Sequence, residues 1–309
     1  EQPVAEAETP LRPHPALTAL IELLEDALEQ FPGAMLVGIG QGGTLGGGGH
    51  AREILKLIGD SGLFLGIDLD RYAAQSFSNE ISNVKNAQIV FRTYTDLIDI
   101  LRRWKLPKVD CLLIDLGFSS DQIDVVERGF SFRKDGPLDM RYDDTNGMTA
   151  GDAVNSLSEK KLSEIIKTFG EDRFADRISK AIVSYRKQKL VTRTTQLADI
   201  ILHAIPRFWK DSIHPATRTF QALRIFVNHE LENLEKILSD IPKIMNTGGR
   251  VSIISFHSLE DRIVKKAFLD FSKEGKAKLI IKKPIVPQFS EQKSNPRSRS
   301  AKLRGIKMN

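Results

Sequence analysis

The sequence has a single cysteine, no long apolar run and almost no basic residues near its N-terminus. Cys111 alone excludes an internal disulfide framework and a cysteine-based zinc site, and it suits a reducing compartment. No stretch approaches the ~20 apolar residues that a bilayer-spanning helix needs, so membrane insertion is not expected. Residues 1–50 hold one basic residue, Arg12, against seven acidic ones, which leaves the remainder with 44 basic and 33 acidic residues. This basic remainder favours a polyanionic partner.

What is present is typical of a soluble globular protein. The 309 residues are 41% apolar and 28% charged, enough for one large domain or two smaller ones. His50, His214 and His257 are too dispersed for a metal-ligand pattern, so we expect no metal. The first 13 residues have neither the basic start nor the apolar core of a signal peptide. We expect a cytoplasmic protein, with a mitochondrial or plastid matrix as the alternative.

Apolar runs and helical periodicity alternate through the first third of the chain. Buried strands are predicted at 35–37, 63–67, 88–91 and 110–116, and helices at 15–30, at 50–58, from 72 and at 96–104. Strand and helix alternating at this pitch predict a parallel, doubly wound α/β sheet.

From residue 118 to about 214 the pattern is helical, with no evident buried strand. Ser158 is predicted to cap one helix, and Thr194 or Thr195 is predicted to cap another. A third helix is expected at 174–185. The alternating pattern then resumes with a helix at 220–238, a turn at 248–249, a strand at 250–256, a helix at 259–271 and an edge strand at 278–281 in a basic tail.

A glycine-dense loop follows the first predicted strand and has two registers. Gly38–Gly43 fits G-x-G-x-x-G directly after the strand, and Thr44–His50 lies beside the next helix start. Asp68 ends the next strand, where a carboxylate can accept hydrogen bonds from the hydroxyls of an adenosine ribose. The alternative is that Asp68 and Asp70 cap the following helix. The glycine-dense loop and the Asp68 carboxylate together favour an adenosine-type cofactor. They do not distinguish a dinucleotide from S-adenosylmethionine.

Six longer motifs are more specific. They read DLGFSSDQ at 115–122, ERGFSFRKDGPLDMR at 127–141, FGEDRFA at 169–175, HPATRTFQALRI at 214–225, SFHSLEDRIVK at 255–265 and NPRSRSAKLR at 295–304. From about Thr44 to its end, the chain resembles the small-subunit (16S-type) ribosomal RNA cytosine-N4 methyltransferase family.

The resemblance implies an α/β fold of class I (Rossmann-like), a methyltransferase domain at 1–117 and 215–309, and a helical, RNA-binding insertion at 118–214. It implies S-adenosylmethionine as methyl donor and a decoding-region cytosine of the small ribosomal subunit as acceptor, and it leaves a homodimer open. The family's first strand ends in an aspartate where this chain has Gly42, so we expect that strand to shift back to 35–39. By motif match, the cofactor-binding residues would be Gly48, Gly49, His50, Asp68, Tyr94, Asp115 and Gln122.

Methylation of an exocyclic amine is an in-line displacement at a sulfonium methyl. The N4 lone pair of cytosine is delocalised into the ring, and a carboxylate that accepts an N4–H bond would localise it. Asp115, which ends a buried strand, is therefore the catalytic candidate. Alternatively it binds the cofactor's amino group or caps the loop.

A base must leave its stack to reach such a pocket, where aromatic or apolar groups hold it. Phe118, Phe130 and Phe132 could hold the base or anchor their loop to the core. Asp139 and Arg141 either shape the pocket or form a structural ion pair. Contacts to RNA phosphates are predicted for the following basic groups: Arg218, Arg224, Arg262, Lys265, Lys266 and the tail 276–307, whose alternative is a solvated tail.

Two other functions fit part of the pattern. A nicotinamide-dependent dehydrogenase would explain Gly38–Gly43 and Asp68, yet 118–214 offers no evident hydride partner. A non-enzymatic RNA-binding assembly factor would explain an altered first strand that has lost its cofactor affinity.

Overall fold

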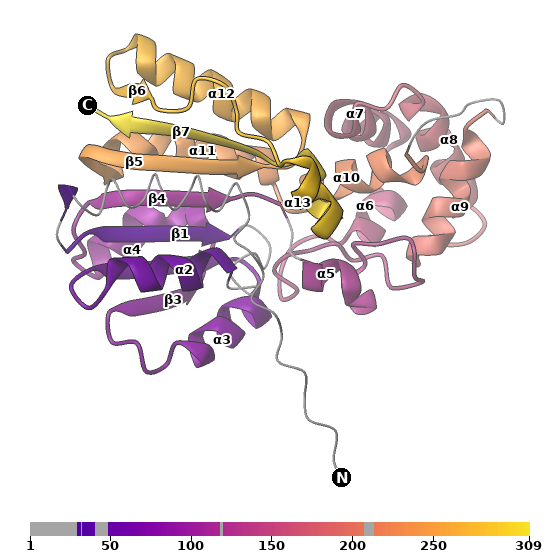
Figure 1. Ribbon diagram of the computed structural model, residues 1–309. Helices are drawn as coiled ribbons and strands as arrows, with labels where there is room; N and C mark the ends of the chain where they lie inside the picture. The colour runs from indigo at the N-terminus through magenta and orange to yellow at the C-terminus, as the bar shows by residue number, and fades with distance from the viewer. Residues whose placement is uncertain (1–29, 32, 41–48, 118–119, 207–212) are drawn as a thin grey trace.

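A seven-stranded sheet in the order β3-β2-β1-β4-β5-β7-β6 organises the chain (Figure 1). The computed structural model describes residues 30–31, 33–40, 49–117, 120–206 and 213–309. Strands β1 to β5 are parallel, and β7 runs antiparallel to both β5 and β6. The bounds are β1 Met35–Gly40, β2 Leu63–Asp68, β3 Ala87–Phe91, β4 Val109–Asp115, β5 Met245–Ser255, β6 Ala277–Leu279 and β7 Lys302–Met308.

Helices cover both faces of this sheet, as a doubly wound fold requires. Val37 and Leu112 belong to one buried cluster, and their neighbours Leu36 and Cys111 belong to the other. The alternation arises because successive side chains of a strand point to opposite faces. On the first face lie α4 (Leu97–Arg103), α11 (Glu230–Ile244) and α12 (Ser258–Lys273), and on the second lie α2 (Gly49–Ile58) and α3 (Arg71–Glu80).

The predicted doubly wound α/β sheet is confirmed. Each strand predicted in the first third is present with bounds within three residues of the prediction, because a strand buried on both faces reads as a nearly continuous apolar run. The first strand does lie early, at Met35–Gly40. The helix predicted at 15–30 falls outside the described residues, apart from a helical Gln30.

A helical second lobe follows β4 and lies beside the carboxyl ends of the parallel strands (Figure 1). It buries an apolar cluster of its own, to which α7 contributes Leu162 and α8 contributes Ile178. Phe220 and Leu223 of α10 belong to the same cluster, so this core extends past residue 214. The bounds are α5 Ser120–Asp124, η2 Val126–Arg128, α6 Ala150–Ser156, α7 Glu159–Gly170, α8 Ala175–Arg186, α9 Thr194–Ala204 and α10 Ala216–Val227.

Helix boundaries in this lobe show where the sequence pattern was misleading. Ser158 caps α7 as predicted. The helix predicted at 220–238 is instead two helices, α10 and α11, because the chain turns at His229 with φ of 51°. Thr194 lies inside α9 rather than capping it. Its hydroxyl donates to the Lys134 carbonyl and accepts from the Gly136 amide, each at 3.0 Å.

The basic tail is folded, which corrects the solvated-tail alternative. The predicted edge strand is present as β6, and after α13 (Phe289–Ser294) and η3 (Pro296–Ser300) strand β7 runs between β5 and β6. Lys302 and Arg304 of β7 donate to the Asp261 carboxylate at 2.9 and 2.7 Å. Two of the tail's cations are therefore neutralised within the fold.

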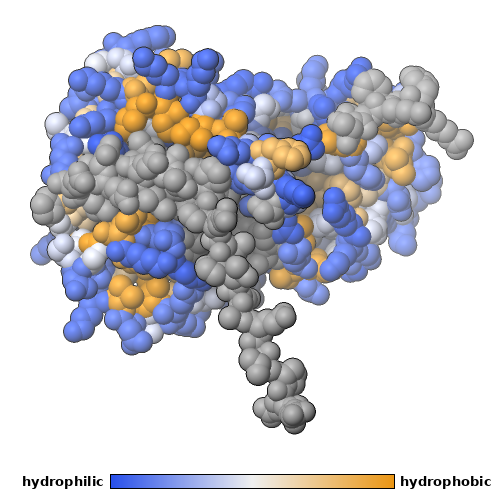
Figure 2. Space-filling model, in the orientation of Figure 1, coloured by the Kyte–Doolittle hydropathy of each residue, from blue (hydrophilic) through white to orange (hydrophobic). Residues whose placement is uncertain are grey.

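Hydrophilic residues cover most of the described surface turned to the viewer in Figure 2. Exposed apolar side chains such as Tyr72, Leu190 and Phe289 belong to different parts of the chain. In the part of the chain that the structure describes, no helix combines the length and apolarity needed to cross a membrane.

Candidate functional site

The carboxyl ends of the parallel strands bring two acidic residues to either side of β1. In the sheet register, Gly40 at the end of β1 lies opposite Asp68 of β2 on one side and opposite Asp115 of β4 on the other. The strand order reverses here, because the chain passes from β1 to β2 and β3 and then returns to β4 on the other side of β1. Open α/β sheets bind ligands at such a switch point.

Asp68 and Asp70 have different roles in the turn after β2. Asp68 is fully buried, and its Oδ1 accepts the Asp70 amide at 2.8 Å. Asp70 is the N-cap of α3 and accepts the amides of Tyr72 and Ala73 at 2.9 and 3.1 Å. The capping role that the sequence left open is therefore carried by Asp70, and Asp68 is the carboxylate at the strand end.

The second carboxylate oxygen of Asp70 receives two donors from the second lobe. Gln122 Nε2 lies 2.6 Å away and Arg128 Nη1 lies 2.7 Å away. Arg128 Nη2 also donates to the carbonyls of Arg141 and Tyr142, at 3.0 and 2.9 Å. The predicted cofactor residue Gln122 is thus tied to Asp70. The Arg128 guanidinium therefore connects the β2–α3 turn to the segment around Arg141, which the sequence predicts to shape the pocket for the target base.

His50 near the start of α2 faces Asp115. His50 Nδ1 lies 3.3 Å from Asp115 Oδ2, with the side chains 28% and 13% exposed. Burial by itself lowers the pKa of His50, but the hydrogen bond and the charge of Asp115 outweigh it, so the pKa is raised. Gly49 is the first residue of α2. The predicted cofactor residue Gly48 lies outside the described residues.

Tyr94 follows β3 in a short 3₁₀ helix, η1 (Tyr94–Asp96), and is buried in the first apolar cluster. Its hydroxyl has no hydrogen-bond partner among the residues that the structure places. Burial raises the pKa of this phenol well above its ordinary value, and the charges of Glu230 and Glu260 raise it further. Buried hydroxyls are usually satisfied, so this one points to a water or a ligand group.

The aromatic residues after Asp115 pack within the second lobe. Phe132 stacks on His214 with ring centroids 4.7 Å apart and meets Phe220 edge-on at 4.9 Å. Phe130 stacks on Tyr142 at 5.6 Å. These contacts fit the anchoring alternative, and base contact by Phe132 stays a prediction. Phe118 lies outside the described residues.

Asp139 and Arg141 form the ion pair that was one of their two predicted roles. Arg141 Nε and Nη2 donate to Asp139 Oδ1 and Oδ2, both at 2.8 Å. Nearby, Gly129 has φ of +71°, and a Cβ there would lie 2.2 Å from the Pro137 carbonyl oxygen. Only glycine tolerates that approach, which folds the segment back on itself beside the pair.

A buried ion-pair network, which the sequence did not predict, lies between the two lobes. Arg224 Nε and Nη2 donate to Glu230 Oε1 and Oε2 at 2.7 and 2.9 Å, and the Tyr142 hydroxyl donates to Glu230 at 2.9 Å. The side chain of Arg224 is only 10% exposed. The expectation that Arg224 contacts RNA phosphates does not fit this position.

The network continues toward the start of α12. His257 Nε2 lies 3.1 Å from Glu260 Oε1. Burial by itself raises the pKa of Glu260, but His257, the charge of Arg224 and the Phe256 amide together outweigh it, so the pKa is lowered. Ligand atoms of Glu230, His257 and Glu260 lie within 4.8 Å of one another, a spacing that a metal ion could use. Because both oxygens of Glu230 accept from Arg224, the arrangement favours an ion-pair cluster. The His257-x-x-Glu260 capping box was the one available sequence signal.

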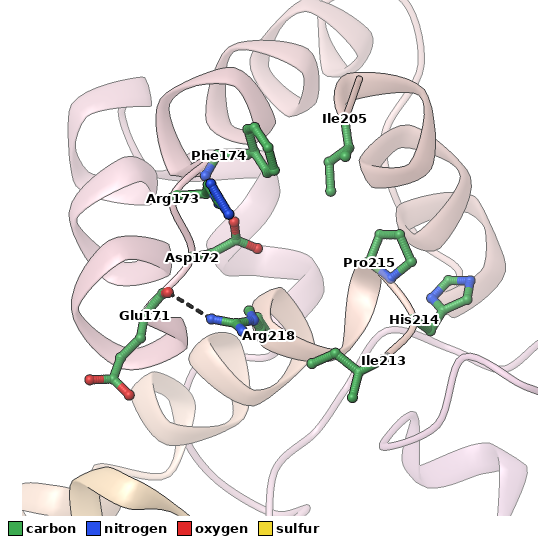
Figure 3. A pocket seen from close by; sticks show the side chains of 9 residues that line it. All are labelled: Glu171, Asp172, Arg173, Phe174, Ile205, Ile213, His214, Pro215 and Arg218. Atoms are coloured by element: carbon green, nitrogen blue, oxygen red, sulfur yellow. Dashed lines mark hydrogen bonds between the residues drawn. The ribbon is translucent and has the colours of Figure 1, made fainter. Parts of the chain in front are cut away.

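Arg218 lies at the wall of a separate cavity of about 250 Å³ in the second lobe (Figure 3). Its Nη1 donates to the Glu171 carbonyl at 2.9 Å. Arg262 Nη2 lies 2.6 Å from the Glu171 carboxylate, while Lys265 and Lys266 are exposed on α12. Arg218, unlike Arg224, therefore remains a candidate for contact with RNA.

Nearly the whole chain matches one known protein family. Residues 17–309 match the model of the MraW methylase family. The ribosomal RNA small subunit methyltransferase H of Halothermothrix orenii is 44% identical over 277 residues, 84% of this chain and 89% of that protein. The protein of the same name from Syntrophobacter fumaroxidans is 41% identical over 96% of this chain and 98% of its own length. A solved rRNA methylase of Streptococcus thermophilus aligns with 97% of this chain and 98% of its own at 9% identity and a TM-score of 0.42, too distant to support a conclusion about the site.

Proposed function

Because this chain belongs to the MraW methylase family, we propose that it transfers the methyl group of S-adenosylmethionine to the N4 amine of a cytidine in small-subunit ribosomal RNA. The observation that carries the proposal is the placement of Asp68 and Asp115 on either side of Gly40 at the switch point of the sheet. Neither a nicotinamide enzyme nor a non-catalytic assembly factor is supported by the family match.

The residues at the switch point fit S-adenosylmethionine. Asp68 would accept hydrogen bonds from the ribose hydroxyls, because it is a buried carboxylate at the end of the strand next to β1. The start of α2, with Gly49 and His50, would present helix N-terminal amides to the same ligand. The unsatisfied hydroxyl of Tyr94 is a third group that a ligand could engage. When bound, the cofactor supplies an electrophilic sulfonium methyl.

Asp115 is the residue that we assign to the target amine. Its carboxylate would accept one N4–H bond, localise the nitrogen lone pair and hold the amine for in-line attack. The N4–C bond forms as the sulfur–carbon bond breaks, and the amine loses one proton, for which Asp115 is the proposed acceptor. His50, whose Nδ1 lies 3.3 Å from Asp115 Oδ2, would help to hold this carboxylate in place.

We assign the second lobe, residues 118–214 together with α10, to the RNA. Its position beside the carboxyl ends of the strands supports this assignment (Figure 1). Arg218, Arg262, Lys265 and Lys266 remain the phosphate candidates, whereas Arg224 is buried in its ion pair with Glu230. The protein would bind the small subunit in the compartment where the subunit is assembled. That compartment is the cytoplasm of a bacterium or the matrix of an organelle. A homodimer stays a prediction.

The proposal is tested by methyl transfer from radiolabelled S-adenosylmethionine to small ribosomal subunits isolated from a strain that lacks the enzyme. We expect one methyl group per subunit, recovered as N4-methylcytidine after nuclease digestion, and none with subunits that already carry the modification. S-adenosylhomocysteine should bind in calorimetry, and NADH should not. RNA binding without cofactor binding would instead support an assembly factor, and label in a base other than cytosine would overturn the assignment.

A further inference from the structure

We propose that the cavity between α7, α9 and α10 binds one unstacked nucleotide of the RNA, in addition to the target cytidine. The cavity has a volume of about 250 Å³ and opens in the second lobe, outside the switch-point site (Figure 3). The inference rests on the proposed function and adds a second RNA contact to it.

Four apolar side chains line this cavity. Phe174 and Ile205 lie across from Ile213 and Pro215, and the side chains of all four face the space between the helices in Figure 3. Pockets for small planar groups are lined largely by such residues, with a few polar groups that fix orientation. A base that has left its stack finds here the apolar and aromatic contacts that single-stranded RNA sites use.

Two arginines supply positive charge at the cavity. The Arg218 guanidinium is oriented by its bond to the Glu171 carbonyl, and the Arg173 guanidinium lies 5.6 Å from the centre of the Phe174 ring. Planar guanidinium groups bind phosphate oxygens and also stack on bases. A nucleotide whose base packs against the apolar side chains and whose phosphate faces the arginines would contact both parts of the lining.

The acidic residues of the lining do not oppose this ligand. The Glu171 carboxylate already accepts from Arg262 at 2.6 Å and from the Ser258 hydroxyl at 2.7 Å, and these bonds lower its pKa. Asp172 is 5% exposed and accepts the Phe174 amide at 2.9 Å. Its carboxylate can also accept a hydrogen bond from an N–H group of a base.

Two contacts connect the lining of the cavity to segments that follow β4 and β5, near Asp115. His214 lines it, and the ring of His214 stacks on Phe132, which belongs to the segment that follows β4 and Asp115. Glu171 lines it as well and contacts Ser258 and Arg262 at the start of α12, which follows β5. The cavity therefore adjoins segments that leave the same end of the sheet. An RNA strand whose cytidine lies at Asp115 would pass close to this cavity.

The test uses two variants of the full-length chain that alter the cavity in independent ways. Ile213→Trp fills it from a side chain that is 41% exposed and so needs no core rearrangement. Arg173→Glu reverses a charge at its wall. Arg177→Glu is the matched control, because Arg177 is also exposed and lies on α8 without lining the cavity. The substrate is the unmethylated small subunit.

We expect both cavity variants to raise the KM for the subunit about tenfold, with kcat and the Kd of S-adenosylhomocysteine within about twofold of wild type. Arg177→Glu should change the KM by less than about twofold. Unchanged KM values in both cavity variants would overturn the inference, as would an equal effect of Arg177→Glu, which would indicate a diffuse electrostatic contribution. A weakened Kd for S-adenosylhomocysteine would place the defect at the switch point and contradict a separate site.

A photo-crosslinking amino acid at position 213 provides a second measurement. Crosslinking should mark a single nucleotide near the modified cytidine, mapped by primer extension. Crosslinks only to ribosomal protein, or scattered along the RNA, would contradict the inference. Failure of the proposed function looks different, because the wild-type chain would then transfer no methyl group at all.

Discussion

Arg128 and Asp70 form an ion pair across the boundary between the two lobes, with 2.7 Å between Nη1 and Oδ2 and side chains only 12% and 3% exposed. Removing the guanidinium leaves a buried carboxylate with a weaker set of donors. We therefore expect Arg128→Ala to lower the free energy of unfolding by about 3–5 kcal/mol in urea denaturation. Arg297 pairs with Asp124 at the surface, and Arg297→Ala should cost no more than about 1 kcal/mol. Equal losses of unfolding free energy in the two variants would contradict a stabilising role for the buried Arg128–Asp70 pair.

Arg224 should behave as a structural residue rather than an RNA ligand. Because its guanidinium holds both oxygens of Glu230, Arg224→Ala should destabilise the fold by about 3–5 kcal/mol. At temperatures where the variant stays folded, the dependence of RNA binding on salt should keep its wild-type slope, since no phosphate contact is lost. A slope reduced by about one unit would show that Arg224 does reach a phosphate.

Asp115→Asn separates catalysis from cofactor binding. The amide is nearly isosteric but presents a weaker acceptor, so kcat should fall by about 10²–10⁴ while the Kd of S-adenosylhomocysteine changes by only a few-fold. Asp124→Asn, an exposed change on α5, should leave kcat at the wild-type level. If Asp115→Asn instead abolished S-adenosylhomocysteine binding with kcat preserved at saturation, Asp115 would belong to the cofactor's amino group.

The pair of His50 and Asp115 should make stability depend on pH. The folded-state pKa of His50 is raised, so its contribution is fully present below the unfolded pKa of about 6.5 and is lost as the pH rises through the folded value. The stability difference between wild type and His50→Gln should therefore be larger at pH 5.5 than at pH 9. Gln75→Ala, an exposed change on α3 at a residue that does not titrate, should show no such trend. A difference independent of pH would mean that the pKa of His50 is the same in the folded and unfolded states.

Cys111 should report on global unfolding. The residue is fully buried in β4, and burial raises the pKa of its thiol to about 12. Since only the thiolate reacts, a thiol reagent at pH 8 should label the native chain at the rate of unfolding and label the denatured chain immediately. Rapid labelling without denaturant would show that β4 is accessible in the native state.

The elements of the sheet could be predicted because burial on both faces leaves a local signature. The runs that became β2 and β4 are apolar whatever their neighbours are, and register then places Asp68 and Asp115 together. Strand β7 lacks that signature, since Lys302, Arg304 and Lys307 alternate with its buried residues. Asp261, far away in the sequence, accepts from Lys302 and Arg304 and balances their charges within the sheet.

The buried ion pairs behind the site could not be predicted, because they depend on contacts that no local sequence pattern reveals. Helical periodicity continues across residue 228, and nothing in it predicts that His229 takes a positive φ and starts a new helix. That turn is what brings Glu230 back to Arg224 and Tyr142. Arg224 reads as a surface cation in a basic chain, and only the three-dimensional arrangement shows that its partner lies six residues later.

The position of β7 also affects how the protein behaves at high concentration. This strand is hydrogen-bonded to β5 along its length, from Ser255↔Lys302 to Arg250↔Lys307. If β7 were detached, for example by a proteolytic cut between residues 282 and 301, β5 would become a long edge strand with a row of unpaired backbone groups. Such edges pair with the edges of other molecules. We therefore expect β7 to protect the protein against aggregation by covering the edge of β5.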